Sequence, residues 1–278
     1  MFAWRITPSL LALCVLLSCI VVGCAPTANE PNLAEVTHDR RGDRQSVIAT
    51  FSIVAVDPES GVCGAAVASK YPAVGEVVPY VRGGVGAFCT QHYHNPDFGP
   101  RTLEMLAEGK PPSEILFELT RDDPRADTRQ LAIIDHRGRT AQLNPIAAPE
   151  RSLWWGGMSG RFYACQGNTL VGRDVVTAMA AAYETTEGTL ADRLMAALVA
   201  GDRKGGDHRG RLAAGIVVDK PEVDGDWLNL QVDKSDDAVR DLANKYVELE
   251  HEAKGEWEND QPPWQEMPVE RETVPAEN

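Results

Sequence analysis

A threonine at the head of an apolar run is the first residue of this chain whose position suggests chemistry. Thr50 opens an alternating run over residues 50–56, and a second run covers 62–68 after an Asp-Pro-Glu-Ser-Gly turn segment. This pattern predicts a β-hairpin whose first strand begins at Thr50. A threonine hydroxyl attacks an amide when a base activates it, and a free α-amine on the same residue is such a base. That amine requires cleavage of the Ala49–Thr50 bond; otherwise Thr50 is a β-branched residue that begins a strand.

Neutral polar side chains follow two further apolar runs. Thr90 and Gln91 end one of them, and Gln166, Gly167 and Asn168 end the other. Fixed hydroxyl and amide groups can hold a substrate carbonyl or stabilise a developing oxyanion without carrying net charge. Strand-to-loop turns use the same residue types, so that interpretation stays open. We predict that these five residues bind substrate.

A glycine-rich basic segment, Gly-Gly-Asp-His-Arg-Gly-Arg, covers residues 205–211. It precedes an apolar run and lacks the Lys-Ser/Thr ending of a nucleotide-binding loop. We interpret it as a loop that brings Asp207 and Arg209 to the rim of the pocket, where a guanidinium clamps a carboxylate.

Two histidines raise the question of a metal. His92 and His94 have, with Asp97, a spacing compatible with a metal ion. The strand is interrupted immediately afterwards by Asn-Pro, and a convincing third ligand is lacking. We therefore predict no metal site and no cofactor.

Six short blocks in a fixed order give the chain a family resemblance. They cover residues 50–55, 66–75, 84–101, 129–135, 166–168 and 205–211. Together they resemble DUF1028, a family of unknown function found in bacteria and archaea, within the N-terminal nucleophile (Ntn) hydrolases. The resemblance extends from Thr50 to about residue 250.

The resemblance implies a fold and a reaction. Ntn hydrolases are α+β proteins, with a four-layer α/β/β/α sandwich that contains two antiparallel sheets. Carried over to this chain, the resemblance makes Thr50 the nucleophile. Ser69 and Lys70, at the end of the second hairpin strand, would supply the hydroxyl and the cation that tune it. A solvated strand end is the alternative for this pair.

The elements that must position these residues follow from the apolar periodicity. Besides the hairpin, strands are predicted over residues 81–91, 130–135, 161–166, 211–218 and 227–232. Helices are predicted over residues 100–108, 113–121, 173–183, 189–200 and 236–250. Runs of strands followed by runs of helices indicate an α+β architecture.

The N-terminus resembles a lipoprotein signal peptide over residues 1–23. Arg5 supplies a positive start, residues 10–22 are apolar, and Val-Val-Gly before Cys24 fits a lipobox. The apolar run is shorter than the roughly 20 residues of a membrane-spanning helix. We predict lipidation at Cys24 and a location in the cell envelope, lipid-anchored on the extracytoplasmic side, periplasmic or at the outer membrane.

Cysteine usage fits that compartment. Two cysteines leave with the signal peptide and Cys24 carries the lipid, which leaves Cys63, Cys89 and Cys165. Cys89 and Cys165 each precede a pocket segment and are candidates for a disulfide in an oxidising compartment.

Charge and composition divide the rest of the chain. We expect a flexible tether over 24–46, a domain over 47–250 and a disordered acidic Pro/Glu-rich tail over 251–278. Much of the formal net charge of −14 lies at the C-terminal end. The domain itself is only mildly acidic, which argues against nucleic acid or anionic lipid as a partner of its surface.

Three functions remain open. The first is an Ntn-type amidohydrolase that cleaves a small amide or peptide outside the cytoplasm, with Thr50 as nucleophile. The alternative is a non-catalytic ligand-binding envelope lipoprotein that retains the Ntn fold. The third is an interaction protein whose tail, with Trp257 and Trp264, engages a partner. A homo-oligomer is compatible with each of them.

Overall fold

The computed structural model describes residues 47–48, 50–147, 152–221 and 227–254. This part of the chain is mixed α and β, with two antiparallel sheets and six α-helices. The predicted signal peptide, Cys24, the tether and the tail from residue 255 lie outside the described residues. Within them, no helix has the length and apolar character needed to cross a membrane.

The larger sheet has six strands in the order β11-β10-β3-β2-β9-β8. Its strands are β2 (Thr50–Val56), β3 (Cys63–Ser69), β8 (Trp154–Gly160), β9 (Tyr163–Leu170), β10 (Ala213–Asp219) and β11 (Leu228–Val232). The predicted hairpin is confirmed, and its register pairs Thr50 with Ser69.

The second sheet has five strands and follows the order β1-β5-β6-β7, with β4 also paired to β5. Its strands are β1 (Val47–Ile48), β4 (Pro79–Arg82), β5 (Gly86–Tyr93), β6 (Arg129–Asp135) and β7 (Thr140–Leu143). The chain therefore enters through β1 on this sheet and continues into β2 on the other.

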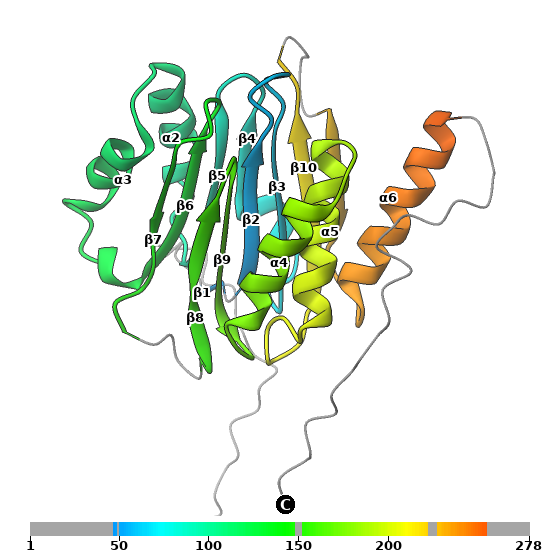
Figure 1. Cartoon of the computed structure of the whole chain (residues 1–278). Helices are drawn as coiled ribbons and strands as arrows, with labels where there is room; N and C mark the ends of the chain where they lie inside the picture. Colours follow the sequence, from blue (N-terminus) through cyan, green and yellow to red (C-terminus); the bar gives the residue numbers. More distant parts are fainter. Residues whose placement is uncertain (1–46, 49, 148–151, 222–226, 255–278) are drawn as a thin grey trace, which may run out of the picture. The chain divides into compact units, whose positions relative to one another are not determined.

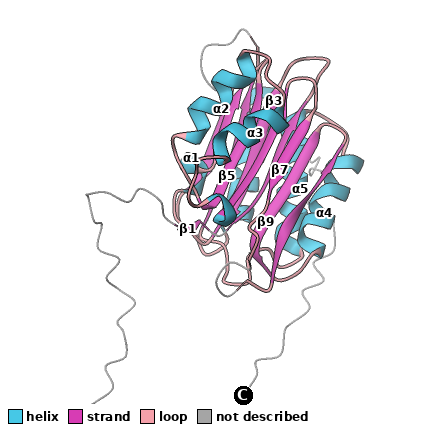
Figure 2. Ribbon diagram, turned by 90° about the vertical axis from the view of Figure 1, so that its left-hand side faces the viewer, coloured by secondary structure: helices cyan, strands magenta, loops and turns pink. Residues whose placement is uncertain are grey.

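Helices cover the outer face of each sheet, and an apolar core lies between the sheets (Figures 1 and 2). The helices are α1 (Val74–Val77), α2 (Phe98–Ala107), α3 (Pro112–Thr120), α4 (Asp174–Thr185), α5 (Leu190–Arg203) and α6 (Ala238–Lys254). Helices α4, α5 and α6 pack on the six-stranded sheet, and α2 and α3 pack on the other.

Strand alternation explains this layering. Along β2, Phe51, Ile53 and Ala55 belong to the core under the helices, whereas Val54 and Val56 belong to the core between the sheets. Successive side chains of a strand point to opposite faces, so one apolar run serves two cores at once.

The structure corrects several element predictions. Residues 81–91 are not one strand, because a turn between β4 and β5 occupies residues 83–85. Gly84 has φ +70°, and a Cβ on Gly83 would lie 2.2 Å from the backbone of Lys220, so this turn requires glycine. The strands β7 and β8 and the short helix α1 were not predicted. In β8, three glycines obscure the alternation on which the prediction depends.

Cys89 and Cys165, the candidates for a disulfide, do not pair. Both residues are free and buried, as is Cys63. Cys89 lies in the core between the sheets, whereas Cys165 lies in the core under the helices. The two side chains therefore occupy different layers. Burial raises the pKa of Cys89 to about 12, and it raises that of Cys63 to about 12 as well, so both are protonated thiols at neutral pH.

Candidate functional site

One end of the space between the sheets is polar rather than apolar. The side chains that gather there come from five strands, are all fully buried, and form what we call the inter-sheet polar cluster: Thr50, Ser52, Ser69, Gln91, Gln130, Gln166 and Asn168. On each strand these residues share the parity of the apolar residues between the sheets. Alternation thus aims all seven into the same layer.

Thr50 and Ser69 form a hydroxyl pair at the start of β2. They are register partners across β2 and β3, and Thr50 Oγ1 donates to Ser69 Oγ at 3.1 Å. Ser69 Oγ also accepts from the Tyr71 backbone N–H at 2.9 Å, which fixes its position. Since β1 pairs with β5 in the other sheet, the chain passes from one sheet to the other between Ile48 and Thr50.

Amide side chains connect the two sheets beside this pair. Gln91 Nε2 donates to the Thr50 carbonyl at 3.2 Å and to Gln130 Oε1 at 2.7 Å, and Asn168 Nδ2 donates to the same Gln130 oxygen at 2.9 Å. Ser52 Oγ donates to Gln91 Oε1 at 2.7 Å. The cluster carries no ionised side chain, so any charge that developed inside it would be stabilised by fixed dipoles alone.

Two acceptor atoms of the cluster receive no hydrogen bond from the described residues. Asn168 Oδ1 and Gln166 Oε1 are buried and have no hydrogen-bond partner among the described residues. A buried polar atom of this kind destabilises the fold by about 1–3 kcal/mol. Such atoms in an otherwise connected network are therefore candidates to receive hydrogen bonds from a bound molecule.

The glycine-rich loop borders the same end of the six-stranded sheet. His208 N donates to the Thr169 carbonyl at 3.0 Å, and Leu212 N donates to the Ser69 carbonyl at 2.7 Å. The loop therefore crosses from the end of β9 to the end of β3, past the start of β2 that lies between them. Within it, Arg209 makes a bidentate ion pair with the buried carboxylate of Asp207, at 2.7 and 3.0 Å.

Two of the four described non-glycine residues with positive φ lie beside the cluster. His92 follows Gln91 with φ 62°, and Thr169 follows Asn168 with φ 53°. Non-glycine residues rarely adopt this conformation, and it recurs at functional sites. Burial lowers the pKa of His92, partly offset by the hydrogen bond between its Nδ1 and the Thr128 carbonyl at 2.6 Å. His92 is therefore neutral at pH 7.

Other predicted site residues lie elsewhere. Thr90 pairs with Leu131, whose side chain is in the core under α2 and α3, so Thr90 faces away from Thr50. Lys70 is exposed and makes no ion pair among the described residues. Gly167 contributes its carbonyl, which accepts from Gln130 Nε2 at 2.8 Å. Nowhere in the described part of the chain do three or more His, Cys, Asp or Glu side chains gather to hold a metal.

Two members of the cluster were not predicted as site residues from the sequence. Ser52 lies inside an apolar strand, whereas Gln130 begins the strand predicted over residues 130–135 and is the second residue of β6. The available signal was parity. Ser52 is two residues after Thr50, so it must share the face of Thr50.

Comparison with known proteins assigns the chain to a protein family. Residues 50–242 match the family of unknown function DUF1028. A crystal structure of a Silicibacter pomeroyi protein, described by the same family name, is 28% identical, with a TM-score of 0.64 over 72% of this chain and 89% of that one. No curated protein matches the sequence. Because the matched span includes the whole inter-sheet polar cluster, the family relation covers the candidate site as well as the fold, and the chain belongs to the DUF1028 family.

Proposed function

We propose that the described chain is the uncut form of an Ntn-type amidohydrolase in which Thr50 becomes the nucleophile. The order helix, sheet, sheet, helix supports an Ntn-like sandwich. The observation that carries the proposal is the Thr50–Ser69 hydroxyl pair at the point where the chain crosses between the sheets. Cleavage there would create an α-amine on the same residue that carries the hydroxyl.

In this reaction Thr50 supplies both the nucleophile and the base. The α-amine takes the hydroxyl proton as Oγ1 attacks the carbonyl carbon of the substrate amide, and the same proton passes to the leaving nitrogen as the C–N bond breaks. Water, deprotonated by the amine, hydrolyses the ester on Oγ1 and releases the carboxylic acid. Ser69 orients the hydroxyl through the bond at 3.1 Å.

The surroundings of Thr50 favour an uncharged amide as substrate. Asn168 Oδ1 is an acceptor for a substrate N–H. The amide groups of Gln91 and Gln130 would stabilise the developing oxyanion only after leaving the acceptors to which they donate in the uncut chain. In the adjacent glycine-rich loop Asp207 already neutralises Arg209, so a substrate carboxylate would have to compete with that ion pair. A small amide or peptide bound through its backbone groups fits this arrangement.

Intact mass and N-terminal sequencing of the purified protein test the proposal. We expect a species that begins at Thr50 and hydrolyses members of an aminoacyl-anilide panel. Thr50→Ala should abolish hydrolysis, whereas Thr50→Ser, which keeps a hydroxyl and an α-amine, should retain part of it. Turnover by protein with an intact Ala49–Thr50 bond, or by the alanine variant, would refute the mechanism.

The second candidate is a ligand-binding lipoprotein that is never cut. Thr50 is fully buried in the uncut chain, and Lys70, which should tune a nucleophile, is exposed. These two observations favour binding without catalysis. An intact Ala49–Thr50 bond in the mature protein, together with saturable binding of an amide, would support this function. For both functions we propose the envelope location that the lipobox predicts.

A further inference from the structure

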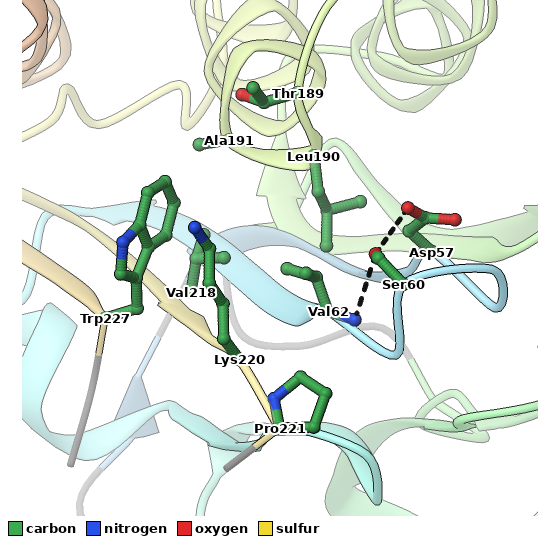
Figure 3. A pocket seen from close by; sticks show the side chains of 10 residues that line it. All are labelled: Asp57, Ser60, Val62, Thr189, Leu190, Ala191, Val218, Lys220, Pro221 and Trp227. Atoms are coloured by element: carbon green, nitrogen blue, oxygen red, sulfur yellow. Dashed lines mark hydrogen bonds between the residues drawn. The ribbon is translucent and has the colours of Figure 1, made fainter. Parts of the chain in front are cut away.

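A cavity lies at the other end of the six-stranded sheet from the inter-sheet polar cluster, where β2 ends. The β2–β3 turn, the end of β10, the start of β11 and the first turn of α5 surround it, and its volume is about 650 Å³ (Figure 3). This volume lies within the range of small-molecule sites. Thr50 begins β2 and the cavity adjoins the turn after Val56, so the cavity is separate from the inter-sheet polar cluster.

The middle of the cavity is apolar. Val62, Leu190 and Val218 line it with aliphatic side chains, and Trp227 adds an indole ring that is 43% exposed. Exposed tryptophan beside aliphatic groups gives a small molecule a large apolar contact area. This surface favours a ligand with a hydrophobic body.

Opposite charges lie on either side of this apolar middle. The Lys220 ammonium lies 3.5 Å from the centroid of the Trp227 ring and makes no ion pair among the described residues. The Asp57 carboxylate accepts from Ser60 Oγ at 2.5 Å and from Glu59 N at 3.1 Å, and the described residues provide it with no cation. Figure 3 shows Val62 and Leu190 between the two charged groups.

The fixed geometry of these groups indicates that the charges are held in place. Asp57 is part of a closed turn, in which its N–H donates to the Val62 carbonyl and its carbonyl accepts from Gly61 N, both at 2.8 Å. Lys220 is held over the indole by a cation–π contact, which leaves its N–H donors available. By contrast, the Thr189 hydroxyl is already engaged with Asp192 in the cap of α5.

We propose that this cavity binds a zwitterion with an apolar body, a hydrophobic amino acid or short peptide. Its carboxylate pairs with Lys220, its ammonium pairs with Asp57, and its side chains contact Val62, Leu190 and Trp227. Each ion pair supplies a partner for a charge that has none among the described residues. The site does not depend on Thr50, so it stands whether or not the chain is an amidohydrolase.

Three related ligands test the proposal by calorimetric titration of the full chain. L-leucyl-L-leucine keeps both charges, its N-acetyl form lacks the ammonium, and its C-terminal amide lacks the carboxylate. We expect the parent dipeptide to bind at least about tenfold more tightly than either derivative. Trp227 fluorescence should change on binding, and Trp227→Phe should remove that change.

Protein variants assign each preference to one residue. Lys220→Met should remove the preference for the free carboxylate and keep that for the free amine, and Asp57→Asn should do the reverse. Gln231→Leu, at a β11 position outside both the cavity and the inter-sheet polar cluster, is the matched control and should bind like wild type. Absence of saturable binding at millimolar dipeptide, equal binding of the three ligands to wild type, or unchanged preferences in both variants would overturn the proposal. The wild-type comparison decides even if a variant fails to fold.

Discussion

Gln130→Leu tests whether the inter-sheet polar cluster holds the two sheets together. Gln130 is fully buried; its Nε2 donates to the Gly167 carbonyl at 2.8 Å, and its Oε1 accepts from Gln91 at 2.7 Å and Asn168 at 2.9 Å. Leucine has a similar volume but makes none of these bonds. Asn168 Nδ2 would lose its acceptor, which destabilises by about 1–3 kcal/mol, and the other lost bonds bring the expected decrease in unfolding free energy to about 2–4 kcal/mol.

Guanidinium unfolding followed by tryptophan fluorescence measures this change by linear extrapolation. The matched control is Gln231→Leu, because Gln231 donates to Asn229 on the exposed surface of β11. The control should change the unfolding free energy by less than about 0.5 kcal/mol. In a thermal scan, Gln130→Leu should lower Tm by about 5–15 °C. A loss no larger than that of the control, with an unchanged denaturant dependence, would refute the structural role of the cluster.

Three further predictions concern single side chains. Burial lowers the pKa of His92, so below about pH 6.5 the imidazole binds a proton in the unfolded chain but stays neutral in the folded chain. The unfolding free energy should therefore decrease from pH 7 to pH 5, and the decrease should be smaller in His92→Asn. Burial raises the pKa of the thiols of Cys63, Cys89 and Cys165, which should stay unreactive toward a disulfide reagent at pH 8 until denaturant is added. Maturation at Cys24 should be sensitive to globomycin, and a Cys24→Ala protein that remained in the carbonate-washed membrane fraction would contradict the anchor.

Five of the seven residues of the inter-sheet polar cluster, Thr50, Ser69, Gln91, Gln166 and Asn168, were predicted from the sequence. The turn segment after Val56 sets the length of the β2–β3 hairpin, and that length makes Thr50 and Ser69 register partners. Gln91 and Asn168 were also predicted, because each ends an apolar strand. Asn168 lies near Thr50 because antiparallel pairing brings the end of β9 beside the start of β2, whereas Gln91 reaches Thr50 from the opposite sheet.

The contacts of the cluster between the two sheets could not be predicted, because they depend on how strands far apart in the sequence face each other. Gln130 meets Gln91 as its register partner across β5 and β6, but it reaches Asn168 only because β6 and β9 lie in opposite sheets. No local pattern reports that juxtaposition. Thr90 and Gln91 are neighbours on β5, but their side chains point to opposite faces of the sheet. Gln91 therefore joins the cluster, whereas Thr90 faces the core under α2 and α3.

The proposed cut before Thr50 and the predicted lipid anchor at Cys24 have opposite effects on the attachment of the domain to the membrane. Lipid at Cys24 holds the N-terminus to the membrane, but cleavage before Thr50 separates that lipid from the domain. Among the described residues, β1 is held by its pairing with β5 through Val47–Tyr93 and Ile48–His92. Backbone hydrogen bonds add only about 1 kcal/mol each, so a two-residue strand cannot retain the domain. Wild-type protein that begins at Thr50 should therefore be soluble after fractionation. If the cut is self-catalysed, Thr50→Ala lacks the hydroxyl that makes it, and this variant should remain uncut and stay with the membrane. Processed protein that stayed with the membrane would contradict this expectation.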